Sequence, residues 1–478
     1  RTSLLTEAEQ ARLRPGLLVR FRQDTGDGFR DDARVHRLPT LVVPATTSPT
    51  PFLTVKPFRA NFEGFIRVPL GETHRFRVTA KGIAKCLING AEVLAFDSTK
   101  PDSVAASQPV ELKGGYNRLE LKYESQPLVD AEVKLYWSSE SFAEEPLPPT
   151  VLFHRSDDPQ LVRMAELRRG RELFADLNCQ RCHSGVFDKA AAGESPLVEL
   201  NQRPPDLLRL PQITDAWLVA WLTDPAAVRH DAHMPRLFTA DADGKQQAAD
   251  VAAYLRSLVK PPPQDATPKI PAETAELIAA GETLYENLSC VSCHRFTEPN
   301  VKDDAQRRPF HFARARWSSL LSMAQFLTQP HANQPAIRMP DFQLSLAEGF
   351  QLAAYIRSQA KGERPAAVDL SKANPNRGRE LFTAKGCQNC HELDQKPVAE
   401  TRRLPLKGKV ITRACLAEQL PANATWPLFS LSTYDREALT AFASGDLTAL
   451  TRDPPVEASQ RLFHSLRCAS CHDRDQDR

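Results

Sequence analysis

The chain of 478 residues repeats one short motif four times, Cys-x-x-Cys-His. The copies are Cys179-Cys182-His183, Cys290-Cys293-His294, Cys387-Cys390-His391 and Cys468-Cys471-His472. This spacing is the attachment signature of c-type haem, in which two thiols bond the haem vinyl groups and the adjacent histidine ligates the iron. Paired cysteines also bind zinc or form thioredoxin-like redox couples. Four copies in a chain with only 10 cysteines favour haem, and predict haem c as the cofactor at each motif.

Two cysteines, Cys86 and Cys415, lie outside the motifs. They either form a disulfide or are buried, inert thiols, and we favour the second because nothing in the sequence pairs them. Haem is attached covalently outside the cytoplasmic membrane, so a periplasmic or extracellular protein is expected. The chain begins with Arg1 rather than Met, and we expect that a signal peptide was removed or is missing from the sequence.

The charge of the chain is nearly balanced, with 61 Lys and Arg against 59 Asp and Glu. A formal charge of +2 argues against nucleic acid or an anionic membrane surface as partner. A hydrophobic content of 41% and the absence of any run of eighteen apolar residues indicate a water-soluble chain without a membrane span.

Proline-rich stretches divide the sequence at residues 144–150, 260–272, 363–376 and 452–457. Before the first of them, runs such as GFIRVPL and NRLELKYE alternate in polarity and are separated by turn residues, which predicts a β-sandwich. After it, helical patterns surround each motif. The predicted domains are a β-sandwich at 1–150, helical domains at 160–260, 272–361 and 374–450, and the incomplete start of a fourth at 456–478.

The order of strands and turns in the first third of the chain resembles the protective-antigen-type β-sandwich domain. In that family an acidic pair before a glycine can hold calcium and a sugar. Here Ala80 and Lys81 precede Gly82, and Asn89 replaces a later acidic residue. The resemblance therefore implies a docking or spacer domain as the favoured role and carbohydrate binding as the less favoured one.

A glycine and an aromatic residue precede the first cysteine of three motifs at constant distances. The pairs are Gly170 and Phe174, Gly281 and Tyr285, and Gly378 and Phe382, while the fourth copy has Ser459 and Phe463. The pattern predicts an amphipathic helix that runs into the motif. Its glycine lets a second helix approach closely, and its aromatic side chain packs at the crossing.

Each repeat also ends in a helical segment that carries an aromatic residue, namely Tyr254, Tyr355 or Phe442. Helix, motif, middle helix, ligand loop and closing helix together resemble class I-type cytochrome c domains, in three tandem copies over residues 160 to 450. The repetition itself is typical of domains.

The second axial ligand of each iron is expected from the loop before the closing helix. Met234, in His-Met-Pro, follows the first motif, and Met339, in Arg-Met-Pro, follows the second. In cytochromes c this context carries the distal ligand, so the resemblance implies Met234 for haem one and Met339 for haem two. The alternatives are His230 or His233 for haem one and His311 or His331 for haem two. The other methionines, Met164 and Met323, are expected in the core.

The third copy has no methionine after its motif. Trp426 stands sixteen residues before Phe442, as Met339 does before Tyr355. Because an indole N–H is only a donor, tryptophan cannot ligate iron. Haem three is therefore five-coordinate or water-bound and shielded by Trp426, takes a ligand from elsewhere, or is a low-potential relay. The candidate donors from elsewhere are Lys407, Lys409, Cys415 and His464.

Only six polar residues follow His472, which is too few for a ligand loop and a closing helix. We expect the natural chain to continue, a partner to complete this site, or His464 to serve a neighbouring haem. The expected function is a multihaem cytochrome that relays electrons between redox proteins or subunits of a membrane-associated complex. The rivals are a haem enzyme with a peroxidase-like or small-ligand site at haem three, and a carbohydrate- or surface-binding protein with a redox tail.

Overall fold

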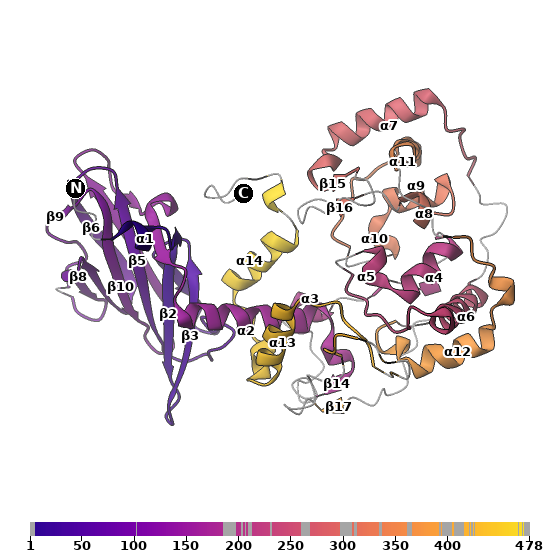
Figure 1. Cartoon of the computed structure of the whole chain (residues 1–478). Helices are drawn as coiled ribbons and strands as arrows, with labels where there is room; N and C mark the ends of the chain where they lie inside the picture. The colour runs from indigo at the N-terminus through magenta and orange to yellow at the C-terminus, as the bar shows by residue number, and fades with distance from the viewer. Residues whose placement is uncertain are drawn as a thin grey trace.

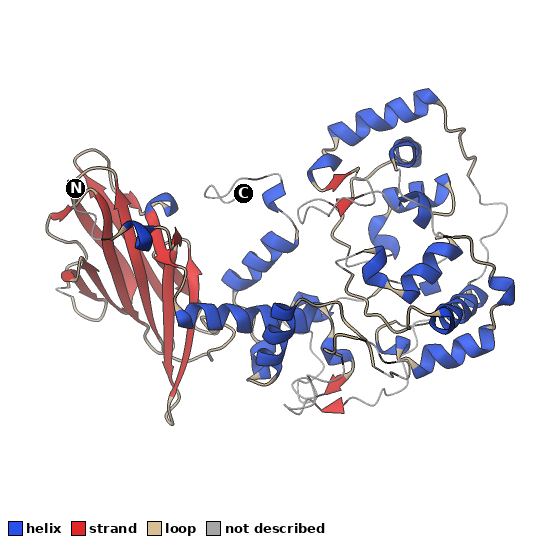
Figure 2. Cartoon of the chain, viewed as in Figure 1, coloured by secondary structure: helices blue, strands red, loops and turns tan. Residues whose placement is uncertain are grey.

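The computed structural model describes residues 5–101, 103–184, 197–201, 204–205, 207–208, 213–229, 232–259, 268–296, 308–309, 313–333, 337–360, 366–391, 393, 404–405, 415–419, 421, 424, 426–466, 468–470 and 472. Its N-terminal part is a β-sandwich, and helices account for most of the rest (Figures 1 and 2). The predicted fold class, an all-β domain followed by all-α domains, is confirmed.

Two antiparallel sheets form the sandwich. The larger sheet contains β1 (Leu13–Pro15), β13 (Leu152–Arg155), β5 (Arg59–Val68), β10 (Gly115–Glu124), β7 (Ile83–Ile88) and β8 (Ala91–Asp97) in that order, with β2 (Leu17–Asp24) paired to β5 and β3 (Phe29–His36) paired to β2. The smaller sheet contains β12 (Glu145–Pro146), β11 (Ala131–Ser139), β6 (Glu72–Lys81) and β9 (Val110–Leu112), with β4 (Thr40–Val43) on β11.

Alternation along the strands explains why the sheets face each other. In β10 the buried apolar residues are Leu119, Leu121 and Tyr123, and in β6 Phe76 and Val78 are buried. Since successive side chains of a strand point to opposite faces, each strand presents one apolar face to the shared core. The proline-rich segment 144–150 is part of this domain rather than a linker, because β12 and β13 lie within or just after it and pair with the sheets.

The helical part begins with α2 (Pro159–Asp176), which extends away from the sandwich (Figure 1). The remaining helices are α1 (Glu7–Gln10), α3 (Val198–Asn201), α4 (Asp215–Thr223), α5 (Pro225–Val228), α6 (Ala242–Leu258), α7 (Ala275–Asn287), α8 (Ala313–Arg316), α9 (Leu320–Thr328), α10 (Pro330–Asn333), α11 (Leu346–Gln359), α12 (Pro375–Ala384), α13 (Thr433–Ala443) and α14 (Pro455–Ser465). Within the described residues, none of these helices has the length and apolarity needed to cross a bilayer.

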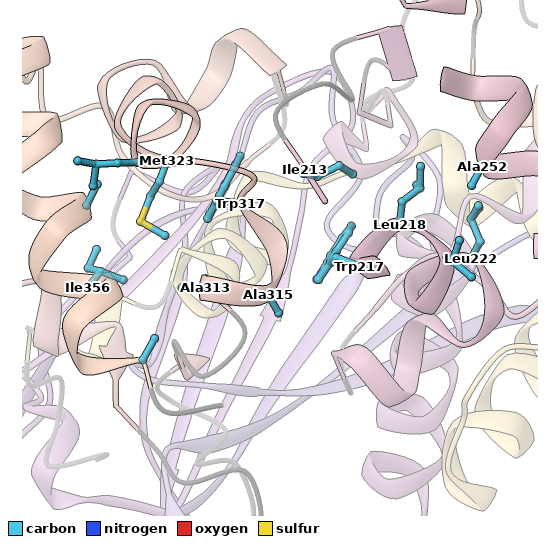
Figure 3. Packing of buried hydrophobic residues seen from close by; sticks show 14 of the residues in the cluster. Ile213, Trp217, Leu218, Leu222, Ala252, Ala313, Ala315, Trp317, Met323 and Ile356 are labelled. Carbon is cyan, nitrogen blue, oxygen red and sulfur yellow. The ribbon is translucent and has the colours of Figure 1, made fainter. Parts of the chain in front are cut away.

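The helices form two cores. The larger one joins α4, α6 and α12 to α7, α8, α9 and α11, and Figure 3 shows Trp217 and Ile213 facing Trp317 and Ala315 at their boundary. A smaller core joins α2 to α13, with Phe174 and Phe442 at its centre. The second repeat therefore shares its core with α6 and α12, while α2 and α13 form a separate lobe.

A buried ionic cluster ties the sandwich to α2 and α14. The Arg168 guanidinium of α2 lies 2.9 Å from Asp32 Oδ1 of β3 and 2.9 Å from Glu457 Oε1 of α14. Arg34 of β3 pairs with the same Glu457 oxygen at 3.1 Å. Nearby, Met164 is buried against Leu18 and Ala33. These contacts join the β-domain to the helical part.

Candidate haem-binding sites

The attachment turns of the first three motifs share one backbone conformation. The chain enters through a residue in the left-handed region, namely Asn178 (φ 54°), Ser289 (φ 55°) or Gly386 (φ 69°). A 3-10 turn follows at η2 (Cys179–Arg181), η5 (Cys290–Ser292) and η7 (Cys387–Asn389), and the fourth motif has the corresponding η10 (Cys468–Ser470). In the first three turns, the second cysteine donates its N–H to the first carbonyl at 3.2 Å. Both thiols thus lie on one short turn, as attachment to a single haem requires.

The histidines predicted as proximal ligands follow these turns and meet a proline-containing segment. His183 and Ser184, in β14, pair in parallel with β17 (Leu404–Pro405). His294 and Arg295, in β15, pair in the same way with β16 (Arg308–Pro309).

His391, the histidine of the third motif, also has a proline partner. The Nδ1 of His391 lies 3.4 Å from the carbonyl oxygen of Pro205. An N–H donated from Nδ1 to a carbonyl leaves Nε2 for iron. Burial lowers the pKa of His391, which favours the neutral ring that iron binds.

The glycine and aromatic positions make the predicted helix crossings. In the second repeat, a β-carbon on Gly281 of α7 would overlap the carbonyl oxygen of Gln351 in α11. The rings of Tyr285 and Tyr355 lie 5.4 Å apart at the same crossing. This repeat therefore packs as the sequence order predicts.

In the first and third repeats, the entering helix does not pack against the closing helix of its own repeat. A β-carbon on Gly170 of α2 would overlap the Ala438 carbonyl oxygen of α13, and one on Gly378 of α12 would overlap the Asp250 carbonyl oxygen of α6. The aromatic pairs agree, since Phe174 meets Phe442 at 6.0 Å and Phe382 meets Tyr254 at 5.8 Å. The two repeats have exchanged closing helices.

The four methionines fall into two groups by burial. Met164 and Met323 are buried core residues. Met234 and Met339 are half-buried and pack on the larger core, which also contains Cys290 and Cys387. The Sδ atom of Met234 accepts a hydrogen bond from Trp221 Nε1 at 3.0 Å. The donor groups described here fit haem c. They are a thioether, two thiols on one turn and an imidazole oriented by a carbonyl.

Trp426 lies in a loop that pairs with the loop of Met234. Arg236 and Leu428 form an antiparallel bridge, with N–H to carbonyl distances of 2.9 Å in both directions. Each of these residues lies two positions after Met234 or Trp426, so the two loops are related by local symmetry. The indole Nε1 of Trp426 is buried and has no hydrogen-bond partner among the described residues.

Both cysteines outside the motifs are free thiols. Cys86 is buried in the sandwich, and burial raises its pKa to about 12, which makes it an inert thiol as favoured from the sequence. Burial and then the neighbouring sulfur of Cys182 raise the pKa of Cys415. Cys415 therefore lies near the first motif, although it belongs to the third repeat.

Other candidate ligands are exposed or lie outside the described residues. His233, His331, His464 and His472 have exposed side chains, and Cys468 is half-buried. His230, His311, Lys407, Lys409 and Cys471 lie outside the described residues.

The positions compared with the calcium-binding family have structural roles here. Lys81, at the end of β6, places its ammonium 3.5 Å from Glu132. The side-chain oxygen of Asn89 accepts the N–H of Arg118 at 2.9 Å.

One contact between motifs was not anticipated from the sequence. The side-chain amide of Asn389, inside the third motif, lies 3.3 Å from the Cys182 sulfur of the first. Nothing in the sequence signals it, because the two motifs are some two hundred residues apart. It places two attachment turns side by side.

The family comparison agrees with these sites. Residues 167–259 and 278–360 each match the family model for cytochrome c. The chain carries tandem cytochrome c domains. The family model follows the sequence order, so its match to 167–259 is independent of which closing helix packs against α2. None of the curated proteins compared with the chain matches it.

Solved structures match about three tenths of the chain. An anti-sigma factor domain-containing protein from Clostridium clariflavum is 18% identical over 29% of this chain and 47% of its own, with a TM-score of 0.26. This chain thus spans about half the length of that structure. The PA14 domain of the antifreeze protein MpAFP is 12% identical over 31% and 94% (TM-score 0.23), and the PA14 sugar-binding domain from an RTX adhesin is 15% identical over 28% and 94% (TM-score 0.24).

Proposed function

We propose that the protein is a multihaem cytochrome that relays electrons outside the cytoplasmic membrane, between redox partners or subunits of a larger complex. Its cytochrome c domains support haem-based electron transfer. The observation that carries the relay is the contact between the Asn389 amide and the Cys182 sulfur. Haems attached to adjoining turns lie close together, as transfer between them requires. The intact mass of the mature protein should exceed that of the chain by four haems.

The ligands are proposed to give the haems different potentials. His183, His294, His391 and His472 are the proximal ligands, and Met234 and Met339 are the distal ligands of two of the haems. Methionine ligation raises the potential relative to weaker or absent ligands. A redox titration should therefore separate two high-potential haems from the others. A ferric spectrum without a methionine-to-iron charge-transfer band would contradict the assignment.

The second methionine gives a direct test. Met339→Leu should abolish part of the charge-transfer band and lower one of the two high potentials. Met323→Leu is the matched control, because Met323 is 2% exposed within α9 and packs in the core. It should leave the band and the potentials unchanged. Equal potentials in both variants would refute Met339 as ligand.

A second candidate function is a small-ligand or peroxidase-like site at the haem that Trp426 faces. The Nε1 of Trp426, which is buried and has no partner in the described part of the chain, favours it, since this N–H is able to donate to a ligand on the iron. Carbon monoxide should then bind one haem of the reduced protein stoichiometrically, and Trp426→Phe should weaken that binding. If carbon monoxide does not bind, no haem iron is open to small ligands, and electron relay is the remaining function.

A further inference from the structure

We propose that the first and third haem sites exchange their distal halves. Met234 is the distal ligand of the haem on Cys387 and Cys390, and the haem on Cys179 and Cys182 faces Trp426. This assignment rests on the proposed attachment of haem c to these motifs. It reverses the order implied by the sequence, and it moves the site without methionine from the third motif to the first.

The helix crossings carry the first part of the argument. In all three repeats the glycine of the entering helix meets a backbone carbonyl of a closing helix, and an aromatic pair lies one turn further on. The geometry is the same in each repeat, but only the second uses its own closing helix. A distal loop precedes each closing helix directly. Because α6 packs on α12, Met234 belongs to the site of the third motif, and because α13 packs on α2, Trp426 belongs to the site of the first.

The proximal side shows the same exchange independently. In the second repeat, His294 pairs with Arg308, which lies before Pro309 of the same repeat. In the first repeat, His183 pairs with Leu404, which lies before Pro405 of the third repeat.

His391 completes the reciprocal arrangement. It contacts the carbonyl of Pro205, which belongs to the first repeat. Pro205 comes only four residues after the end of α3, so the chain already contacts the third repeat at this point. Helix α3 itself stays with the first motif, because Gln180 donates to the Leu200 carbonyl at 2.8 Å.

A buried carboxylate favours α12 as the partner of α6. Asp250 is 1% exposed, and a buried carboxylate requires hydrogen-bond donors. It accepts the backbone N–H of Asn374 at 2.9 Å and the side-chain amide of Gln246 at 3.0 Å, and it pairs with Arg377 at 3.2 Å. The N–H of Asn374 is available because α12 begins at the next residue, Pro375.

Helix α2 carries Arg169 in the place of Arg377, but it has no equivalent free backbone N–H. Counting from the crossing glycine, Glu166 of α2 takes the place of Asn374. Glu166 lies inside α2, which starts at Pro159, so its N–H belongs to the helix. The closing helix that does face α2 has Ala438 where α6 has Asp250, and Ala438 is fully buried. Each closing helix therefore carries the residue type that suits its observed partner.

The exchange requires little additional interaction energy, because the repeated surfaces are interchangeable. Swapping equivalent elements preserves the native contacts and is a recognised low-cost route between protomers. Here it joins two repeats of one chain. The Arg236–Leu428 bridge and the Asn389–Cys182 contact add interface that the second repeat does not share.

Methionine methyl resonances provide the test in the full-length holoprotein. The chain has four methionines, so labelling with methionine that carries a carbon-13 methyl group gives four signals. In the reduced low-spin protein the porphyrin ring current shifts an axial methionine methyl strongly upfield. Met234→Leu and Met339→Leu assign the two shifted signals, and Met323→Leu assigns a core signal as control.

Removal of single haems then identifies the partner of Met234. Cys387→Ala with Cys390→Ala should return the Met234 methyl to its ordinary position, whereas Cys179→Ala with Cys182→Ala should leave it upfield. The reverse result would overturn the exchange. A wild-type spectrum without any upfield methyl would instead refute methionine ligation itself, and with it this part of the proposed function.

A cross-link keeps the test independent of haem removal. Arg169 of α2 lies 2.7 Å from Asp435 of α13. Arg169→Lys places an amine there, and carbodiimide should join it to the carboxylate as an amide, taking up the water that is lost. Peptide mass spectrometry of the variant should find α2 linked to α13. A link from α2 to α6 would overturn the exchange, and wild-type protein is the control.

Discussion

At the scale of single residues, Glu457 is a buried carboxylate where α14 meets α2 and the sandwich. It is 5% exposed and lies between the guanidinium groups of Arg168 and Arg34. Burial alone would raise the pKa of Glu457, but these two cations outweigh it and lower the pKa to about 2. The carboxylate is therefore charged in the native protein at nearly every accessible pH.

We predict that Glu457→Gln destabilises the junction of α14, α2 and the sandwich. Removing one partner leaves buried cations uncompensated, which typically costs about 3–5 kcal/mol. The measurement is denaturant unfolding at neutral pH, followed by circular dichroism. Glu380→Gln, at an exposed position of α12, is the control and should change little. Equal losses in both variants would contradict the prediction.

The same residue predicts a pH dependence. A carboxyl group with a lowered native pKa contributes stability above its unfolded pKa and loses it as the pH falls through the native value. The stability difference between wild type and Glu457→Gln should thus shrink as the pH falls from 4.5 toward 2. A difference that stays constant over this range would show that Glu457 acts through packing alone.

At the scale of elements, the helix crossings decide which sites are built. Each crossing needs a glycine, because the partner carbonyl occupies the space of a β-carbon. The fourth copy carries Ser459 at this position, and its side chain is exposed on α14. A side chain in place of glycine is therefore accommodated in the fourth copy, whereas it would clash with a backbone carbonyl in the other three.

We predict that Gly281→Val separates α7 from α11 and destabilises the second haem site. Overpacking of this kind typically costs about 1–3 kcal/mol, and rigid backbone at the contact makes relief difficult. Thermal unfolding and the haem spectrum of the holoprotein should both change. Ser459→Val is the matched control on α14 and should alter neither. An unchanged melting temperature in Gly281→Val would refute the crossing.

The sequence predicted the components of these sites but not their partners. The motifs, the crossing glycines and the β-sandwich follow from local patterns. The partners do not, because α6, α11 and α13 present similar small and aromatic residues to any entering helix. The discriminating contact lies between the Asp250 carboxylate and the Asn374 N–H. It depends on the start of α12 just after Asn374, whereas α2 is already helical at the equivalent position. Local periodicity carries no information about that pairing.

At the scale of the whole molecule, the β-domain and the first haem lobe are joined by more than a linker. Asp158 caps α2 and also pairs with Arg20 of β2 at 2.6 Å. Arg452, after α13, donates to the carbonyl of Pro51 at 2.7 Å. The sandwich is thus held at both ends of the lobe. This arrangement fixes the orientation of the β-domain relative to α2 and α13.

We predict that the junction at 156–158 resists proteolysis in the native protein. Ion pairs that are partly buried are little screened, so added salt should not release it. Limited digestion at low and high salt, with cleavage sites read by mass spectrometry, provides the measurement. Asp32→Asn, which weakens the pairing with Arg168, should expose the junction. Rapid cutting of the wild-type protein there would contradict the prediction.

The exchanged closing helices also bear on the order in which the protein matures. The second repeat contains both halves of its site, so it is able to close as soon as residue 360 has emerged. The first motif emerges earlier but waits for α13, and α6 waits for α12. The site of the first motif is therefore completed only after α13, which ends at Ala443, has emerged. Because the first and third sites each draw on both repeats, loss of either repeat would leave both sites unfinished.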